Sequence, residues 1–324
     1  MSDEGGGEHG GSTAAIVAAF LANAGIAVAK FVGFVVTGSS ALLAESIHSV
    51  ADASNQGLLL LGGKRAKRAA TPQHPFGYGR ERYIYAFIVA IVLFSLGGLF
   101  ALYEGYHKIE LVLEGESELV NPLVAIVVLV VAIGLETFSL RTAIIESNHV
   151  RGSQSWVQFI RHSRAPELPV VLLEDVGAEI GLILALIGVG LSALTDNAIY
   201  DGIGTMCIGL LLVIIAVILA IETKSLLLGE SATEADVARI EAAIAAEPMV
   251  GGLIHMRTLH LGPEELLVAA KIAIDAQDNA ADVAAAIDAA EVRIREAVPI
   301  ARVIYLEPDL RKAELSEPAT PGAG

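Results

Sequence analysis

Cysteine is almost absent from this chain of 324 residues, whose one copy, Cys207, lies inside an apolar run. A lone cysteine excludes an internal disulfide bond and any cluster of metal-binding thiolates. A metal site in this protein would therefore have to use histidine and carboxylate side chains.

Basic residues are also scarce, since 21 Lys and Arg stand against 37 Asp and Glu and give a formal net charge of −16. Surfaces that bind nucleic acid are usually basic, so this balance argues against a nucleic-acid partner. The N-terminal stretch lacks the basic region that opens a signal peptide. We interpret residues 1–12 as a disordered cytoplasmic tail, and the absence of a transit-like segment favours a prokaryotic cell membrane.

Hydrophobic residues make up 54% of the chain, which indicates a polytopic membrane protein. Six apolar segments are long enough to span a bilayer core of about 30 Å. They cover Ala14–Val36, Ser40–Gly62, Tyr83–Tyr106, Asn121–Ile144, Leu168–Leu194 and Ile199–Ile221. The links after the second and fourth segments are rich in Lys and Arg, whereas the link after the third is acidic. By the positive-inside rule, both termini are predicted to be cytoplasmic.

The composition changes after Leu228 and predicts a small α/β domain. The predicted elements follow in the order helix, strand, strand, helix and strand. They are a helix starting near Thr233, strands over Leu253–Leu261 and Leu266–Asp275, a helix over Ala280–Ala297 and a strand over Ile300–Leu306. This order resembles a ferredoxin-like fold. We therefore predict an all-α membrane bundle of six spans over residues 13–229, a cytoplasmic ferredoxin-like domain over 230–310 and a disordered tail over 311–324.

Three ionisable residues lie inside the second predicted span. At roughly 100° per residue, Glu45, His48 and Asp52 share one face of a helix. Such residues are costly at membrane depth and usually face a bundle interior or a polar path. One imidazole and one carboxylate aimed at a common point suit a divalent metal, although a buried structural hydrogen-bond network would also explain them.

The fifth predicted span carries three carboxylates, Glu174, Asp175 and Glu179. Asp175 and Glu179 are four residues apart and share one helix face, whereas Glu174 points about 100° away. If the second and fifth spans touch, the predicted metal site consists of His48, Asp52, Asp175 and Glu179, with Glu174 and Glu45 as less certain members. Nearby small residues (Gly177, Ala178 and Gly181) would allow the helices to approach closely.

Together with the six spans and the C-terminal domain, two motifs resemble those of the cation diffusion facilitator family. They are His48-x-x-x-Asp52 in the second span and His74-Pro75-Phe76-Gly77-Tyr78-Gly79-Arg80 before the third. The resemblance covers roughly Ala14 to Asp309. It implies a homodimeric exporter that moves zinc or a related divalent cation from the cytoplasm in exchange for protons, with membrane lipid around it. It implies no enzymatic activity and no catalytic cofactor, because the metal is the cargo.

One position departs from the family pattern. The family's fifth span usually has a histidine four residues before the aspartate that matches Asp175, and Val171 stands there instead. The Glu174-Asp175 pair is similar to a branch that also lacks this histidine, the zinc transporters of type nine. Glu179, Glu174 or water could complete the site, and a site with one imidazole makes Mn²⁺, Fe²⁺ or Co²⁺ an open alternative to Zn²⁺. A membrane metal sensor or scaffold that does not transport is a second alternative.

Other polar residues are better explained by structural roles. In the fourth span Glu136 and Arg141 are candidates for inter-helix pairing. Lys30 in the first span is a candidate for neutralising a carboxylate within the bundle or for holding the dimer contact. We interpret His74 as a loop residue rather than part of a second metal site. His255 and His260, five apart in a predicted strand, point to opposite faces, and we expect them to face solvent.

Overall fold

The computed structural model describes residues 24–116 and 120–310. The predicted disordered tails, 1–12 and 311–324, and the start of the first predicted span lie outside these residues. The chain divides into two compact units. The first comprises the described residues up to Ala69 together with Glu81–Leu227, and the second comprises Ala70–Arg80 together with the described residues from Leu228 onward.

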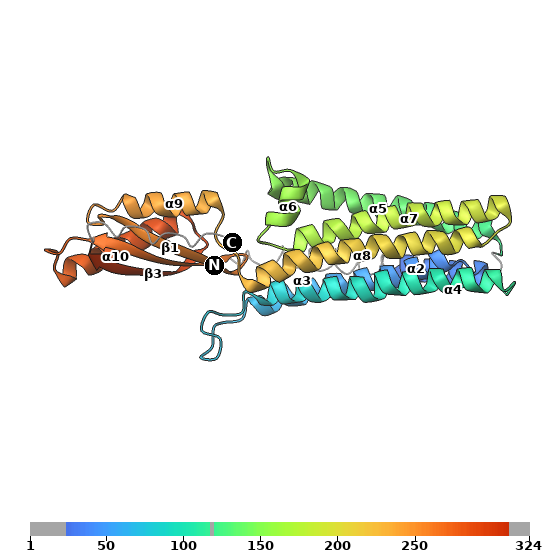
Figure 1. Ribbon diagram of the computed structural model, residues 1–324, viewed down its shortest axis with the longest axis horizontal. Coiled ribbons are helices and arrows are strands. Elements are labelled where there is room, and N and C mark those ends of the chain that lie inside the picture. The colour runs from blue at the N-terminus through green and yellow to red at the C-terminus, as the bar shows by residue number, and fades with distance from the viewer. Residues whose placement is uncertain (1–23, 117–119, 311–324) are drawn as a thin grey trace, which may run out of the picture. The chain divides into compact units, whose positions relative to one another are not determined.

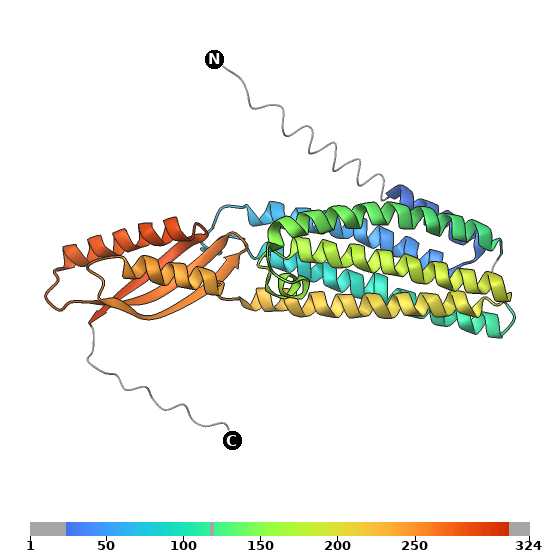
Figure 2. The same ribbon diagram turned by 90° about the horizontal axis from the view of Figure 1, so that it is seen from above.

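Long helices that run alongside one another make up the first unit (Figures 1 and 2). Their order after a helix over Ala24–Thr37 is α2 (Ser40–Ala66), α3 (Glu81–Val92), the π-helical segment η1 (Leu93–Leu99), α4 (Phe100–Leu113), α5 (Pro122–Arg151), α6 (Trp156–His162), α7 (Glu167–Thr195) and α8 (Ile199–Leu228). Each of the six predicted spans coincides with a helix over its described part. The link between the fourth and fifth predicted spans contains the short helix α6, which begins at Trp156.

Three of the described helices are long and apolar enough to cross a membrane. They are the continuous helix Glu81–Leu113, which joins α3, η1 and α4, together with α5 and α8. A shorter apolar helix covers Ala24–Thr37. The helices α2 and α7, which carry the predicted metal ligands, are continuous but contain several ionisable residues among their apolar ones.

Glycines bring α8 unusually close to the α3–α4 helix. A Cβ added at Gly209 would lie 2.6 Å from the backbone nitrogen of Leu102, and one at Gly105 would lie 2.7 Å from the carbonyl oxygen of Gly202. Real Cβ atoms almost never approach so closely, so only glycine fits at these crossings. An apolar core shared by α2, α3, α5, α7 and α8 completes the packing of this unit.

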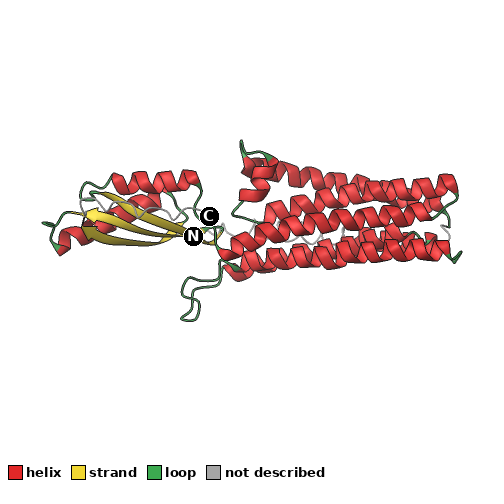
Figure 3. Ribbon diagram, in the orientation of Figure 1, coloured by secondary structure: helices red, strands yellow, loops and turns green. Residues whose placement is uncertain are grey.

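The second unit contains a three-stranded sheet covered by two helices (Figure 3). The strands β1 (Gly252–Gly262), β2 (Glu265–Ile274) and β3 (Ala301–Leu310) lie in that order, with β1 antiparallel to β2 and β2 parallel to β3. The helices are α9 (Glu234–Ala245) and α10 (Ala280–Ala297). The predicted order of helix, strand, strand, helix and strand is therefore confirmed.

Buried and half-buried side chains alternate along β2, which shows that one face of the sheet is covered. Every second side chain from Leu266 to Ile272 is buried and packs with Ile240 of α9 and Ile294 of α10 in one core. Helix α9 begins as predicted, because the Thr233 side chain accepts a hydrogen bond from the backbone of Asp236.

The connection between α2 and α3 belongs to the same unit as the sheet. A Cβ added at Gly79 would lie 2.8 Å from the carbonyl oxygen of Leu261, and one at Gly262 would lie 2.9 Å from the Cα of Gly79. The backbone of the His74–Arg80 motif therefore packs directly on the turn between β1 and β2. His74 is exposed and lies against the ring of Tyr78, with 4.7 Å between the ring centroids.

The two histidines of β1 differ from the expectation. His255 is exposed as predicted, but His260 is 1% exposed, so the expectation that it faces solvent was wrong. Its Nδ1 lies 3.3 Å from the carbonyl oxygen of Gly262 at the strand end. The register of β1 shifts between His260 and Gly262, which places the ring against the turn rather than in water.

Candidate metal site

His48 and Asp52 meet on one face of α2, as their spacing predicts. The Nε2 of His48 lies 3.4 Å from Oδ2 of Asp52, and the imidazole is 1% exposed. Neither ring nitrogen has a hydrogen-bond partner among the described residues. On its other side the ring faces η1, since a Cβ at Gly97 would lie 3.7 Å from Nδ1 of His48. Buried ring nitrogens of this kind are able to act as ligands without breaking an existing bond.

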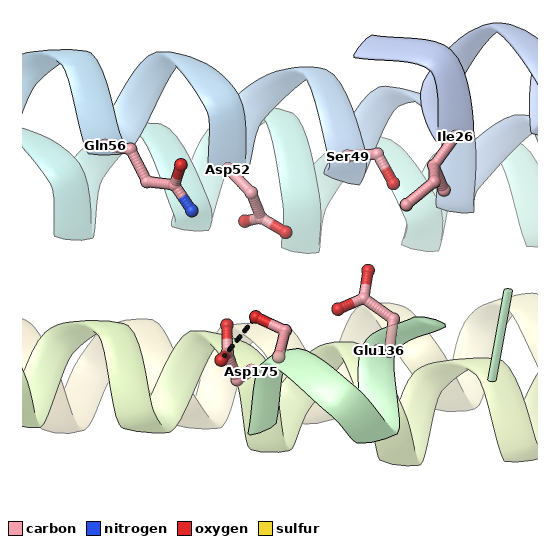
Figure 4. Close-up of a pocket in the computed structure, with 7 residues that line it drawn as sticks. Ile26, Ser49, Asp52, Gln56, Glu136 and Asp175 are labelled. Carbon is pink, nitrogen blue, oxygen red and sulfur yellow. Dashed lines mark hydrogen bonds between the residues drawn. The ribbon is translucent and has the colours of Figure 1, made fainter. Parts of the chain in front are cut away.

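A small cavity joins α2 to α5 and α7. Its volume is about 20 Å³, close to the space that one water molecule needs. Three carboxylates line it, and in Figure 4 those of Asp52, Glu136 and Asp175 point toward the space between the helices. The remaining lining residues are Ile26, Ser49, Gln56 and Ser139.

The cavity confirms that the second and fifth predicted spans lie close to each other at Asp52 and Asp175. Asp175 is held in place by Ser139 of α5, whose hydroxyl donates a 3.0 Å hydrogen bond to its Oδ2. The other carboxylate oxygen of Asp175 is not used in this bond. Asp175 can therefore keep its bond to α5 and still offer an oxygen to an ion.

The two other carboxylates of α7 are bonded elsewhere. Glu179 accepts a 2.9 Å hydrogen bond from the hydroxyl of Thr137, and Glu174 accepts a 2.6 Å hydrogen bond from the side-chain amide of Asn55. Glu174 is 4% exposed. Neither residue lines the cavity.

Glu45 belongs to a buried ion pair. The Nζ of Lys30 lies 3.1 Å from its Oε2 and also donates a 2.9 Å hydrogen bond to Ser49, with Lys30 and Glu45 both fully buried. The expectation that Lys30 neutralises a carboxylate within the bundle is confirmed. Gly181 of α7 faces this pair, because a Cβ there would lie 2.7 Å from Oε1 of Glu45. Gly181 thus permits the close approach predicted for α2 and α7.

The structure brings the predicted ligands together only in part. It joins His48 to Asp52 and places Asp52 and Asp175 on one cavity, while Glu179 lies outside it. Over residues 24–116 and 120–310, no three His, Cys, Asp or Glu side chains are grouped closely enough to hold a metal ion. The four-residue metal site therefore stays a prediction.

Sequence reasoning undervalued Glu136. The structure shows no ion pair of Glu136 or Arg141 within its described part, so the pairing expected for them is not found there, and Glu136 lines the cavity instead. The sequence did contain a signal for Glu136, because it is a carboxylate inside an apolar span. Ionisable residues at membrane depth are costly and usually functional, which is the reasoning already applied to the second predicted span.

Asp201, at the start of α8, is a buried carboxylate that the sequence analysis passed over. It accepts hydrogen bonds from the hydroxyl of Ser39 (2.7 Å) and from the backbone nitrogen (2.7 Å) and hydroxyl (3.1 Å) of Ser40. A carboxylate at the N-terminus of a helix satisfies free N–H groups and interacts favourably with the helix dipole. Asp201 therefore anchors the first turn of α2 and has a structural role.

The helical unit has the sequence signature of a transport family. A family model described as the cation efflux transmembrane domain matches residues 16–228. The chain therefore belongs to the cation diffusion facilitator family, as the two motifs predicted.

Curated relatives include the mitochondrial proton-coupled zinc antiporter SLC30A9 of Mus musculus, which is 30% identical over 249 residues. That alignment covers 76% of this chain and 43% of the relative, so the chain spans less than half the length of this relative. The magnetosome protein MamB of Paramagnetospirillum magneticum is 26% identical over 295 residues, which cover 89% of this chain and 90% of that protein.

Among solved structures, a variant of the MamM C-terminal domain in its nickel form is similar to part of the chain. It is 20% identical, with a TM-score of 0.24, and the match covers 25% of this chain and 100% of that one.

Proposed function

We propose that this protein is a divalent-cation exporter that moves Zn²⁺ out of the cytoplasm in exchange for protons. The observation that carries the proposal is the cavity onto which α2 and α7 each present a carboxylate, Asp52 and Asp175, with His48 beside Asp52. Imidazole nitrogen and carboxylate oxygen are ordinary ligands of divalent first-row metals. Family membership supports the proposal, and the mammalian relatives are named as proton-coupled zinc antiporters.

In the proposed site, His48, Asp52 and Asp175 form the centre. Glu179 remains a proposed fourth ligand, with Glu174 and Glu45 as less central members. Each of these three Glu residues would have to leave or share its present partner to reach the cation. The cation itself is cargo, and we propose no catalytic cofactor and no enzymatic reaction.

Proton exchange follows from the chemistry of the ligands. A metal ion binds deprotonated carboxylates and a neutral imidazole, so binding from the cytoplasm releases protons. When the bundle opens to the other side, protons return to these groups and displace the ion.

The proposed architecture places this site within six spans. Residues 13–229 would form the membrane domain, with both termini cytoplasmic, in a cell membrane and surrounded by lipid. Residues 230–310 would form a ferredoxin-like cytoplasmic domain, for which the strand order β1-β2-β3 and the helices α9 and α10 on one face give support. The homodimer is likewise a proposal.

The test is transport by the full chain in proteoliposomes with an imposed pH gradient and a zinc-sensitive dye inside. We expect Zn²⁺ uptake that collapses when the gradient is removed, and a loss of at least tenfold in His48→Ala and Asp52→Ala. The matched control is His149→Ala, because His149 is an exposed histidine on α5. Transport by the His48 and Asp52 variants at the rate of the control would refute the site.

A second cargo is favoured by one observation. The lining of the cavity is rich in oxygen donors, with three carboxylates, two hydroxyls and one amide. Oxygen donors suit Mn²⁺ better than nitrogen-rich or sulfur-rich sites do. Competition of Mn²⁺, Fe²⁺ and Co²⁺ against Zn²⁺ in the same vesicles would identify the preferred ion. A protein that binds these ions but moves none of them would instead be a metal sensor or scaffold.

A further inference from the structure

The candidate site has an acidic side chain on a third helix that the proposed ligand set does not use. Glu136 of α5 lines the same cavity as Asp52 and Asp175, and its carboxylate points toward them in Figure 4. Within the described residues Glu136 has no hydrogen bond and no ion pair. Its oxygens are therefore free to bind a cation.

The remaining acidic candidates are already engaged. Glu179 accepts a hydrogen bond from Thr137, and Glu174 accepts one from Asn55. Glu45 is paired with Lys30. None of these three residues lines the cavity, so Glu136 is the carboxylate that lies beside Asp52 and Asp175 there.

Two hydrogen bonds from residues just after Glu136 hold α5 against α7. Thr137 follows Glu136 directly and donates to Glu179, and Ser139 lies three residues after Glu136 and donates to Asp175. Helix α5 also packs closely against α7. These contacts set the height and rotation of Glu136, so its approach to the cavity is determined by the packing of the helices.

A second, independent feature indicates that this space receives an ion. His48 is 1% exposed and has no hydrogen-bond partner for either ring nitrogen within the described chain, and its Nε2 lies 3.4 Å from Asp52. The Oδ1 of Asp52 is also buried without a partner. Buried polar groups are normally satisfied, so an unpartnered oxygen of Asp52 in the cavity wall, with the unpartnered imidazole of His48 directly beside Asp52, favours a charged ligand at this point.

We propose that Glu136 is a direct ligand of the transported cation, so that α2, α5 and α7 build the site together. The donor set is then one imidazole, His48, and three carboxylates. This inference rests on the proposed function and refines it. An oxygen-rich set of this kind tolerates harder ions such as Mn²⁺ alongside Zn²⁺, so Glu136 also sets the preference between them.

The experiment compares Glu136→Gln, Glu136→Asp and Glu136→His in the full chain, reconstituted in proteoliposomes, with Zn²⁺ and Mn²⁺ as separate substrates. The matched control is Glu146→Gln, which removes the same charge from an exposed position of the same helix. We expect Glu136→Gln to raise the KM for both ions at least tenfold and Glu136→Asp to recover part of the loss. Glu136→His is expected to keep Zn²⁺ transport and to lower Mn²⁺ transport at least tenfold relative to Zn²⁺.

The change in the Zn²⁺ to Mn²⁺ ratio separates a ligand from a residue that only supports the fold, because misfolding would reduce both rates together. The inference is overturned if the wild type transports and Glu136→Gln has the KM values and the ion preference of Glu146→Gln. If the wild type moves no cation, the proposed function fails. In that case calorimetric titration of the purified full chain with Zn²⁺ and Mn²⁺ still decides the role of Glu136: a tenfold weaker affinity in Glu136→Gln supports ligation, and an unchanged affinity refutes it.

Discussion

The buried ion pair between Lys30 and Glu45 gives the sharpest prediction about stability. Both side chains are fully buried, their charged atoms are 3.1 Å apart, and Lys30 also donates to Ser49. Replacing Lys30 by methionine leaves an uncompensated carboxylate inside the bundle. Breaking a buried pair by removing one partner costs about 3–5 kcal/mol.

That free energy translates into a large change in melting temperature. For a unit of about 150–250 residues, 1 kcal/mol shifts Tm by about 2–4 °C. We therefore expect Lys30→Met to lower Tm by roughly 6–20 °C. The double variant Lys30→Met with Glu45→Gln removes both charges, and it should recover most of the loss because a buried pair replaced as a whole is often close to neutral.

The assay is thermal unfolding of the full chain in detergent, followed by circular dichroism. The matched control is Lys224→Met, which removes a lysine from an exposed position of α8. A Tm for Lys30→Met within 2 °C of the control would refute the reasoning. So would a double variant less stable than the single one.

Three further stability predictions use the same assay. Gly209→Ala should destabilise by about 1–3 kcal/mol, because its Cβ would lie 2.6 Å from a backbone atom of α4, whereas Gly134→Ala, which meets nothing within 4 Å, should not lower Tm. Asp201→Asn should destabilise by about 1–3 kcal/mol, since an amide cannot accept on both sides the bonds that Ser39 and Ser40 donate; an unchanged Tm would show that this anchor is dispensable. Thr233→Ala removes the cap of α9 and should cost about 1 kcal/mol, with Thr233→Ser close to the wild type.

Much of the fold could be predicted from the sequence because its signals are local. The helix predicted over Ala280–Ala297 has the same bounds as α10, and the strands β1 and β2 differ by one residue or so from their predicted ends. Likewise, the meeting of His48 and Asp52 follows from helical geometry alone, because residues four apart share a face. These features need only the periodicity of one segment.

Features that depend on two or more segments were harder to predict. The importance of Glu136 depends on the rotation of α5 against α7, which is set by the bonds that Thr137 and Ser139 donate. The burial of His260 depends on a register shift at the end of β1. Neither the rotation of one helix against another nor an irregularity of register leaves a periodic pattern in a single sequence.

The packing of Gly79 on Leu261 and Gly262 has a consequence for how this chain is divided in experiments. Since Ala70–Arg80 belongs to the unit that holds the sheet, the polypeptide passes between the two units three times, and the sheet-containing unit is discontinuous in sequence. A fragment that starts near Leu228 would lack one of its own segments and would leave the β1–β2 turn bare. A chimera that exchanges this unit with that of a relative should therefore exchange residues 70–80 as well, so that the two glycine backbones that meet come from the same parent.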